Sequence, residues 1–412
     1  KIMKKIFKNQ IALALAGILA GTSAIAGTLV INGDTSDPAP KAAFQAVIDG
    51  FEAENPDVNV VYNLFDHEGY KAAIRNFLTA DAPDIAFWYA GNRMAPYVDA
   101  GLFAPIDDVW AEQGLYTLMK SSAAGMTMDG KKWGIPFSYY QVGMYYRQDI
   151  FEDLGIAVPK TWDQFMSASA TLKANDITPI TIGTKYLWTT GCIFDYLNLR
   201  TNGYDFHMDL ANGNVAWTDD RVRATMAKYK ELVDKEYFDE NHASYTWQEA
   251  LGPLASGEGA MVCMGNFAVA PLRELGLDDS QLGFFQFPEI TPGIPMAEEA
   301  PSDTLHLTAN AKNPTDAKRF LAYAARADVQ TSWNAALGQL PTNSGAEVAD
   351  DKFIKAGFEQ LNNASALSQY FDRDIPAEMA ALGMESLQEF MVKPERLEKI
   401  LERLEKARQK LY

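Results

Sequence analysis

The chain has 412 residues, of which 48% are hydrophobic, and its 54 acidic against 36 basic side chains give a formal net charge of -18 at pH 7. Such a chain repels phosphate backbones and anionic membrane surfaces, so nucleic acid and lipid bilayers are poor partners. Its length and apolar content allow two hydrophobic cores, which predicts two lobes.

Residues 1–26 have the pattern of a secretory signal peptide. Four lysines and no acid come before an apolar run from Ile11 to Leu19, and small residues follow at 24–26. The apolar run is too short to span a bilayer. We expect cleavage near Ala26, which changes the formal charge from -18 to -22. No Cys follows for lipid anchoring, so we expect a free periplasmic protein.

The first part of the mature chain alternates between strand and helix patterns. Residues 28–32, 58–64 and 85–88 have the apolar spacing of short strands, and residues 44–51 and 70–78 have that of helices with one buried face. Strands that alternate with helices in this way predict a parallel sheet covered by helices.

The pattern restarts after residue 146 and predicts a second α/β unit. Residues 162–172 and 219–233 have helical spacing, and residues 179–183 and 260–264 read as short strands.

A connection back to the first unit follows. Residues 288–301 are rich in Pro and Glu and show no periodicity, so we expect an irregular connection. Residues 304–309 predict a returning strand and residues 314–325 a helix. The last helix has one apolar face, which should pack on the second unit.

Two aromatic-rich stretches are the most informative local features. They are PDIAFWY at residues 83–89 and KWGIPF at residues 132–137, which runs on to MYYR at residues 144–147. Each reads as an apolar strand that ends in aromatic and polar residues. Ligands bind at the carboxyl edge of α/β sheets, and a flat ring there can stack on a sugar.

Five further motifs occur along the chain: FEAENPDV at 51–58, YVDAGL at 97–102, DIFEDLG at 149–155, PKTWD at 159–163 and GEGAM at 257–261. Together with the aromatic stretches, in this order and spacing, they resemble the extracellular solute-binding proteins of bacterial ABC sugar importers, the family that includes the maltose-binding protein. The resemblance covers nearly all of the chain after residue 26.

This resemblance implies the type II periplasmic binding protein fold, with two α/β lobes joined by a hinge and a ligand cleft between them. It places residues 27–137 and 303–345 in the N-terminal lobe, and residues 138–302 and 346–412 in the C-terminal lobe. It also implies separate membrane permease subunits as partners. We expect a monomer without a cofactor, a metal or a nucleic-acid partner.

Common enzyme motifs are missing from the sequence. There is no Gly-x-Ser-x-Gly, no Gly-x-x-x-x-Gly-Lys and no Cys-x-x-Cys, and the four histidines lack the spacing of metal ligands. We expect no enzymatic activity, and a secreted glycan-active enzyme is the alternative from another class. Cys192 and Cys263 are too few for a disulfide framework, so each is expected to be a small buried side chain, with a bridge between them left open.

Candidate ligand contacts of the first lobe follow predicted strands: Asp34 after the first, Asp66 and His67 after the second, and Trp88 and Asn92 at the third. Asp66 and Asn92 could instead cap helices. Asp303 precedes the returning strand at a position where many relatives carry glycines or a Trp, which suggests a more polar wall.

Further candidates lie at the crossing between lobes and in the second lobe. The residues after the second aromatic stretch, Tyr139, Tyr140 and Gln141, are candidate ligand contacts. The alternative role for them is packing in the core. Asn266 and Phe267 stand where sugar-binding relatives often have Gly-x-Trp. Trp188 and Trp247 are candidate stacking rings, with a core role as the alternative for Trp188.

Arg373 lies between two acids in YFDRDIP, residues 370–376, where relatives bring a late side chain into the cleft. It could offer its planar fork to vicinal hydroxyls or to an anionic group, or it could be an ion-paired surface turn. The sequence thus predicts capture of a sugar, glycoside or short oligosaccharide for delivery to a permease. A binding protein for an anionic sugar, such as a uronate or a sulfonated glycoside, is the alternative.

Overall fold

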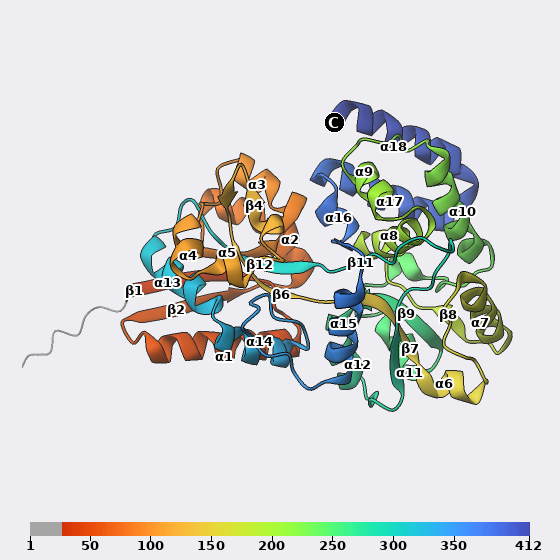
Figure 1. The fold of residues 1–412 in the computed structure, drawn as a ribbon, viewed down its shortest axis with the longest axis horizontal. Coiled ribbons are helices and arrows are strands. Elements are labelled where there is room, and N and C mark those ends of the chain that lie inside the picture. Colours follow the sequence, from red (N-terminus) through yellow and green to blue (C-terminus); the bar gives the residue numbers. More distant parts are fainter. Residues whose placement is uncertain (1–26) are drawn as a thin grey trace, which may run out of the picture.

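Two α/β lobes make up the part of the chain that the computed structural model describes, residues 27–412. The predicted signal peptide, residues 1–26, lies outside the described residues. Figure 1 shows the lobes side by side, each with its own sheet. Each lobe also has its own hydrophobic core. The predicted two-lobed α/β fold is confirmed.

The first lobe is built on a five-stranded sheet of order β2-β1-β3-β12-β6. Its strands are β1 (Gly27–Gly33), β2 (Val58–Leu64), β3 (Ile85–Tyr89), β6 (Ile135–Tyr139) and β12 (Ser302–Leu307). β1 is parallel to β2 and β3, whereas β12 is antiparallel to β3 and β6. The carboxyl ends of four strands and the amino end of β12 therefore meet at one edge of the sheet.

Helices pack on both faces of this sheet because each carries an apolar stripe. In α1 (Pro38–Glu54), Phe44, Val47, Ile48 and Phe51 are buried at helical spacing. All five residues of β3 are buried, as expected for a strand covered on both faces. The other elements of the lobe are α2 (His67–Ala80), the 3-10 helix η1 (Gly91–Arg93), α3 (Ala95–Asp99), α4 (Asp107–Glu112), α5 (Leu115–Leu118), η2 (Ala124–Met126), β4 (Thr127–Met128), β5 (Lys131–Lys132), α13 (Pro314–Ala324) and α14 (Ala327–Leu337).

The second lobe has a four-stranded sheet of order β10-β7-β9-β8. Its strands are β7 (Val142–Arg147), β8 (Thr178–Ile180), β9 (Gly259–Gly265) and β10 (Leu282–Phe285). The helices are α6 (Gln148–Asp153), α7 (Trp162–Ala174), α8 (Trp188–Asn202), α9 (Tyr204–Ala211), α10 (Asp220–Asp234), η3 (His242–Ser244), α11 (Leu251–Ser256), η4 (Asn266–Ala268), α12 (Val269–Glu274), α15 (Lys352–Asn363), α16 (Phe371–Asp374), α17 (Ala377–Val392), η5 (Pro394–Arg396) and α18 (Leu397–Leu411).

The central helix of this lobe is α8, whose residues 189–200 are all buried. Several of its polar side chains have partners inside the core. Arg200 lies 2.6 Å from Glu298, and both are almost fully buried. Glu298 belongs to the two-residue strand β11 (Glu298–Glu299), which pairs with β13 (Leu367–Ser368). The segment 288–301, predicted to be irregular, therefore ends in a short strand that a buried ion pair helps to hold.

The chain passes between the lobes three times, and the three crossings meet in one small apolar cluster. Leu340, Ile354 and Leu361 form this cluster, with Tyr139 and Ala300 packed against it. The backbones of Tyr139 and Leu340 exchange hydrogen bonds of 2.9 Å. No helix within residues 27–412 combines the length and apolar character needed to cross a membrane.

Candidate functional site

The two lobes enclose a cavity of about 150 Å³ at the carboxyl edge of the first sheet. The first lobe lines this cavity with the loop after β1, the start of α2, the carboxyl end of β3 and the amino end of β12. The second lobe lines it with the starts of α8 and α16. Nine of the fourteen predicted ligand contacts line this cavity: Asp34, His67, Trp88, Tyr140, Trp188, Trp247, Phe267, Asp303 and Arg373. That they contact a ligand stays a prediction.

An aspartate–histidine pair lies on the first-lobe side of the cavity. The Nδ1 atom of His67 is 2.7 Å from Oδ2 of Asp34, and the Tyr89 hydroxyl donates to the same oxygen at 3.4 Å. Burial by itself raises the pKa of Asp34, but the hydrogen bond from His67 and the charge of Lys71 hold that pKa below its ordinary value. Asp34 is therefore an ionised hydrogen-bond acceptor at neutral pH.

Arg373 on α16 connects the two lobes across the cavity. Its Nη2 atom is 3.1 Å from Oδ1 of Asp303 on β12, and its Nη1 atom donates to the backbone oxygen of Ser302 at 2.8 Å. The guanidinium carbon also lies 4.2 Å from the centroid of the Tyr89 ring, a cation–π contact. Because Arg373 is only 6% exposed, the alternative of an ion-paired surface turn is wrong.

Asp303 and Arg373 together offer acceptors and donors side by side in the cavity wall. Burial raises the pKa of Asp303, although the charge of Arg373 opposes that rise. A carboxyl group beside a planar guanidinium can hydrogen-bond neighbouring hydroxyl groups in both directions. That this wall is more polar than that of many relatives stays a prediction.

Aromatic rings form the second-lobe wall of the cavity. The ring of Phe267 lies edge-on to Trp247, with centroids 5.0 Å apart, and 6.3 Å from Trp188. Trp188 directly follows Leu187, which has a φ of 70°, a left-handed conformation that is unfavourable for a leucine. The amide of Trp188 donates to the backbone oxygen of Tyr186 at 2.8 Å, which closes a tight γ-turn. This turn determines the direction in which α8 presents Trp188.

Within residues 27–412, no group of three or more His, Cys, Asp or Glu side chains is arranged to hold a metal ion. The cavity instead combines ring faces with paired charges, which is the composition of a site for a polar organic ligand.

A family model for bacterial extracellular solute-binding proteins matches residues 35–331. The chain belongs to this family. An uncharacterised ABC transporter extracellular-binding protein of Pyrococcus horikoshii is 26% identical over 332 residues, 79% of this chain and 74% of that protein. The multiple sugar-binding protein of Streptococcus mutans is 24% identical over 289 residues, 68% of this chain and 67% of that protein.

A solved structure is similar over almost the whole length of this solute-binding protein. It is the bacterial solute receptor AcbH, described as having an exclusive substrate preference for β-D-galactopyranose. Its TM-score is 0.87 at 28% identity, and the match covers 93% of this chain and 99% of that chain. The match extends over both lobes.

Two of the predicted first-lobe contacts lie outside the cavity of this solute-binding protein. Asp66 caps α2, where its Oδ1 atom accepts from the amides of Glu68 and Gly69 at 3.2 and 3.1 Å. Asn92 lies in η1, and its amide nitrogen donates to the backbone oxygen of Asp374 at 2.6 Å. Asn92 therefore joins the first lobe to α16 of the second.

Three more predicted contacts lie beside the crossings between lobes. Tyr139 packs against the small apolar cluster where the crossings meet. Gln141 is fully buried and donates to the backbone oxygen of Phe353 at 2.8 Å. Asn266 accepts from the Tyr145 hydroxyl at 2.8 Å and donates to the backbone oxygen of Gly338. The amides of Gln141 and Asn266 thus donate to backbone oxygens near the crossings.

Several cavity residues were not predicted from the sequence. Lys71 follows His67 by four positions on α2, so helical spacing was a signal that could have found it. Burial lowers the pKa of Lys71, an effect that the nearby Glu68 opposes. Gln339 lines the cavity from the third crossing, a position that no local sequence pattern indicates.

Proposed function

We propose that this solute-binding protein captures one neutral sugar ring, alone or as part of a short glycoside, and delivers it to the permease of an ABC transporter. In this proposal the mature protein is a periplasmic monomer without enzymatic activity. The three crossings form the hinge, and the ligand binds in the cavity between lobes.

The observation that carries this proposal is the pairing of charges in a cavity walled by rings. Asp34 is paired with His67, and Arg373 with Asp303. An ionic ligand would compete with these partners, whereas a neutral polyol can hydrogen-bond to the paired groups and place its apolar face on Trp188 or Trp247. These paired groups favour a neutral sugar over a uronate or a sulfonated glycoside.

The size of the cavity supports a small ligand. At about 30 Å³ per water in the liquid, a volume of about 150 Å³ corresponds to roughly five waters. That space suits one pyranose ring with its hydroxyl groups better than a long oligosaccharide. The preference described for AcbH, a single galactopyranose, is consistent with a site of this size.

Thermal unfolding of residues 27–412 against a panel of neutral and anionic sugars and glycosides tests the proposal. The protein is first unfolded, dialysed and refolded to remove any co-purified ligand. A ligand at a hundred times its Kd adds about 2.7 kcal/mol to the free energy of unfolding and raises the midpoint. We expect this shift with a neutral monosaccharide or short glycoside and no cleavage product by chromatography. Absence of any shift would exclude a sugar ligand, and product formation would indicate an enzyme.

A further inference from the structure

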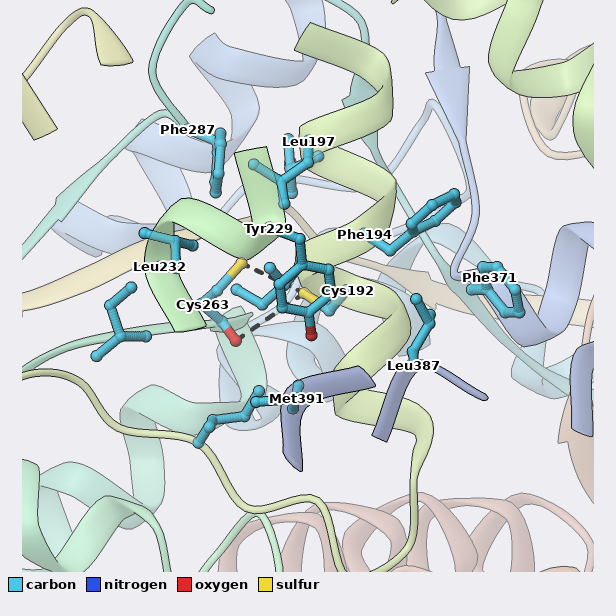
Figure 2. Packing of buried hydrophobic residues seen from close by; sticks show 14 of the residues in the cluster. Cys192, Phe194, Leu197, Tyr229, Leu232, Cys263, Phe287, Phe371, Leu387 and Met391 are labelled. Carbon is cyan, nitrogen blue, oxygen red and sulfur yellow. Dashed lines mark hydrogen bonds between the residues drawn. The ribbon is translucent and has the colours of Figure 1, made fainter. Parts of the chain in front are cut away.

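Two cysteines lie in contact inside the second lobe. The Sγ atoms of Cys192 on α8 and Cys263 on β9 are 3.3 Å apart, and both residues are free thiols in the structure. Figure 2 shows the pair among buried hydrophobic residues of the core that include Tyr229 and Met391. Both side chains are buried, as predicted for small apolar residues. Burial alone does not account for their contact with each other.

We propose that Cys192 and Cys263 form a disulfide when the protein is exported. A disulfide has an S–S distance of about 2.0 Å, so the two sulfurs need to approach by only a little over 1 Å. Both elements are held firmly: α8 is buried along most of its length, and β9 is hydrogen-bonded to β7 on one side and to β8 on the other. The fold itself, and not a flexible loop, therefore brings the sulfurs together.

The composition and the compartment favour this bond. The chain has only two cysteines, so only one intramolecular pairing exists. Proteins of this family are extracellular, and disulfides persist in oxidising compartments outside the cytosol. The chain therefore meets an oxidant at the stage when it folds.

The reaction requires a protein thiol–disulfide oxidant. The thiolate of one cysteine attacks a sulfur of the oxidant's disulfide, forms a mixed disulfide and releases one oxidant thiol. The second cysteine, after losing its proton, attacks its partner's sulfur and releases the second oxidant thiol. Two electrons and two protons pass to the oxidant. Because burial raises the pKa of the Cys192 thiol, we expect these steps before the core closes over the sulfurs.

The disulfide would stiffen the aromatic wall of the cavity. Trp188 precedes Cys192 by four residues on α8, and Phe267 follows Cys263 by four residues, in η4 directly after β9. A covalent link between these elements holds the two rings, whose centroids are 6.3 Å apart, in a fixed relation. It also closes a long loop in the unfolded chain, which lowers the entropy of the unfolded state.

Alkylation under denaturing conditions, read by intact mass, tests the proposal on the wild-type protein purified from the exported fraction. We expect no adduct without reduction and two adducts per chain after reduction. The same protein made in a reducing cytosol should take up two adducts without reduction. Two adducts on the unreduced exported protein would overturn the proposal, as would one adduct or a covalent dimer, because the sulfurs would then be free or paired elsewhere.

Single variants provide the labelling control and a stability readout. Cys192→Ala and Cys263→Ala should each take up one adduct. Reduction should lower the midpoint of thermal unfolding of the exported wild type by several degrees and leave that of a variant carrying both Cys192→Ala and Cys263→Ala unchanged. An equal response of the two proteins to the reductant would contradict a stabilising disulfide.

Discussion

At the scale of single residues, Arg373 determines the polar character of the cavity. Its guanidinium is paired with Asp303, packs on the Tyr89 ring and donates to a backbone oxygen of the other lobe. These contacts hold the planar donor group in one orientation before a ligand arrives, so that little rotamer entropy remains to be lost on binding.

Replacing Arg373 by Ala should weaken binding of the neutral sugar by about tenfold to a hundredfold. The variant loses hydrogen bonds from a charged group, worth about 1.5–3 kcal/mol, and leaves Asp303 without its partner. Isothermal titration calorimetry measures the loss. Arg221→Ala is the matched control, because the Arg221 side chain is 56% exposed and pairs with Asp219 on the surface. The Arg221→Ala variant should bind the sugar with the affinity of the wild type. Wild-type affinity in Arg373→Ala would place Arg373 outside the site.

At the scale of elements, β12 serves the site at one end and the core of the first lobe at the other. Ser302 and Asp303 reach the cavity edge, whereas His306 is fully buried and stacks on Phe103 with centroids 4.3 Å apart. The Nδ1–H of His306 donates to the backbone oxygen of Trp133 at 2.7 Å, and its Nε2 accepts from Thr304 at 2.6 Å. The hydroxyl of Thr304 could accept as well as donate, so it is burial that disfavours the charged form of the ring.

This buried neutral ring predicts a pH dependence of stability. Burial lowers the pKa of His306 to about 4, while the unfolded chain has a pKa near 6.5. Between these values the unfolded state binds the proton and the folded state does not, so the free energy of unfolding falls as pH falls from 6.5 to 4. Each pH unit in this window removes up to about 1.4 kcal/mol.

Urea unfolding at several pH values from 7 to 4.5 measures this effect. His306→Gln should lose less stability across the window than the wild type, even if it starts less stable. His207→Gln should behave likewise, because burial also lowers the pKa of His207 to about 4. If the free energy of unfolding fell equally with pH in His306→Gln and in the wild type, His306 would take up its proton as readily in the folded protein as in the unfolded chain.

At the scale of the whole molecule, contacts between η1 and α16 close the lobes over the cavity. Asn92 donates to the backbone oxygen of Asp374 at 2.6 Å, and Nε of Arg93 lies 3.8 Å from Oδ2 of Asp372. Arg373 lies on the same short helix and lines the cavity. A ligand that bridges the lobes stabilises the arrangement in which these contacts form.

Asn92→Ala should therefore weaken ligand binding although Asn92 lies outside the cavity. The loss of one hydrogen bond that exists only between closed lobes should reduce affinity by about twofold to tenfold. Calorimetry measures the affinity, and small-angle scattering should show less contraction on adding a subsaturating amount of ligand. Asn76→Ala, at an exposed position on α2, is the control and should bind like the wild type. An unchanged affinity in Asn92→Ala would mean that this contact does not contribute to closure.

Local periodicity was sufficient to predict most elements. β2 has the predicted limits, α1, α2 and α7 contain the predicted helical segments, and α10 begins one residue later than predicted. Each of these elements buries one face within its own lobe, so residues close in sequence carry its apolar spacing. The strand predicted at 179–183 is shorter, because β8 ends at Ile180 and the chain then turns toward α8. The order of the motifs along the chain then indicated the family and, through it, the two-lobed fold.

Partners distant in sequence were decided only by the tertiary structure. Asp34 and Asp66 both follow a strand of the same sheet, yet one faces the cavity and the other caps a helix. Arg373 has acids on both sides in the sequence but pairs with Asp303, and Arg200 pairs with Glu298. Side-chain direction and pairing depend on how the lobes pack, and no spacing within one segment encodes that packing. The sequence thus determined the elements, the family and the edge of the sheet at which the cavity lies, while packing decided which side chains face the cavity.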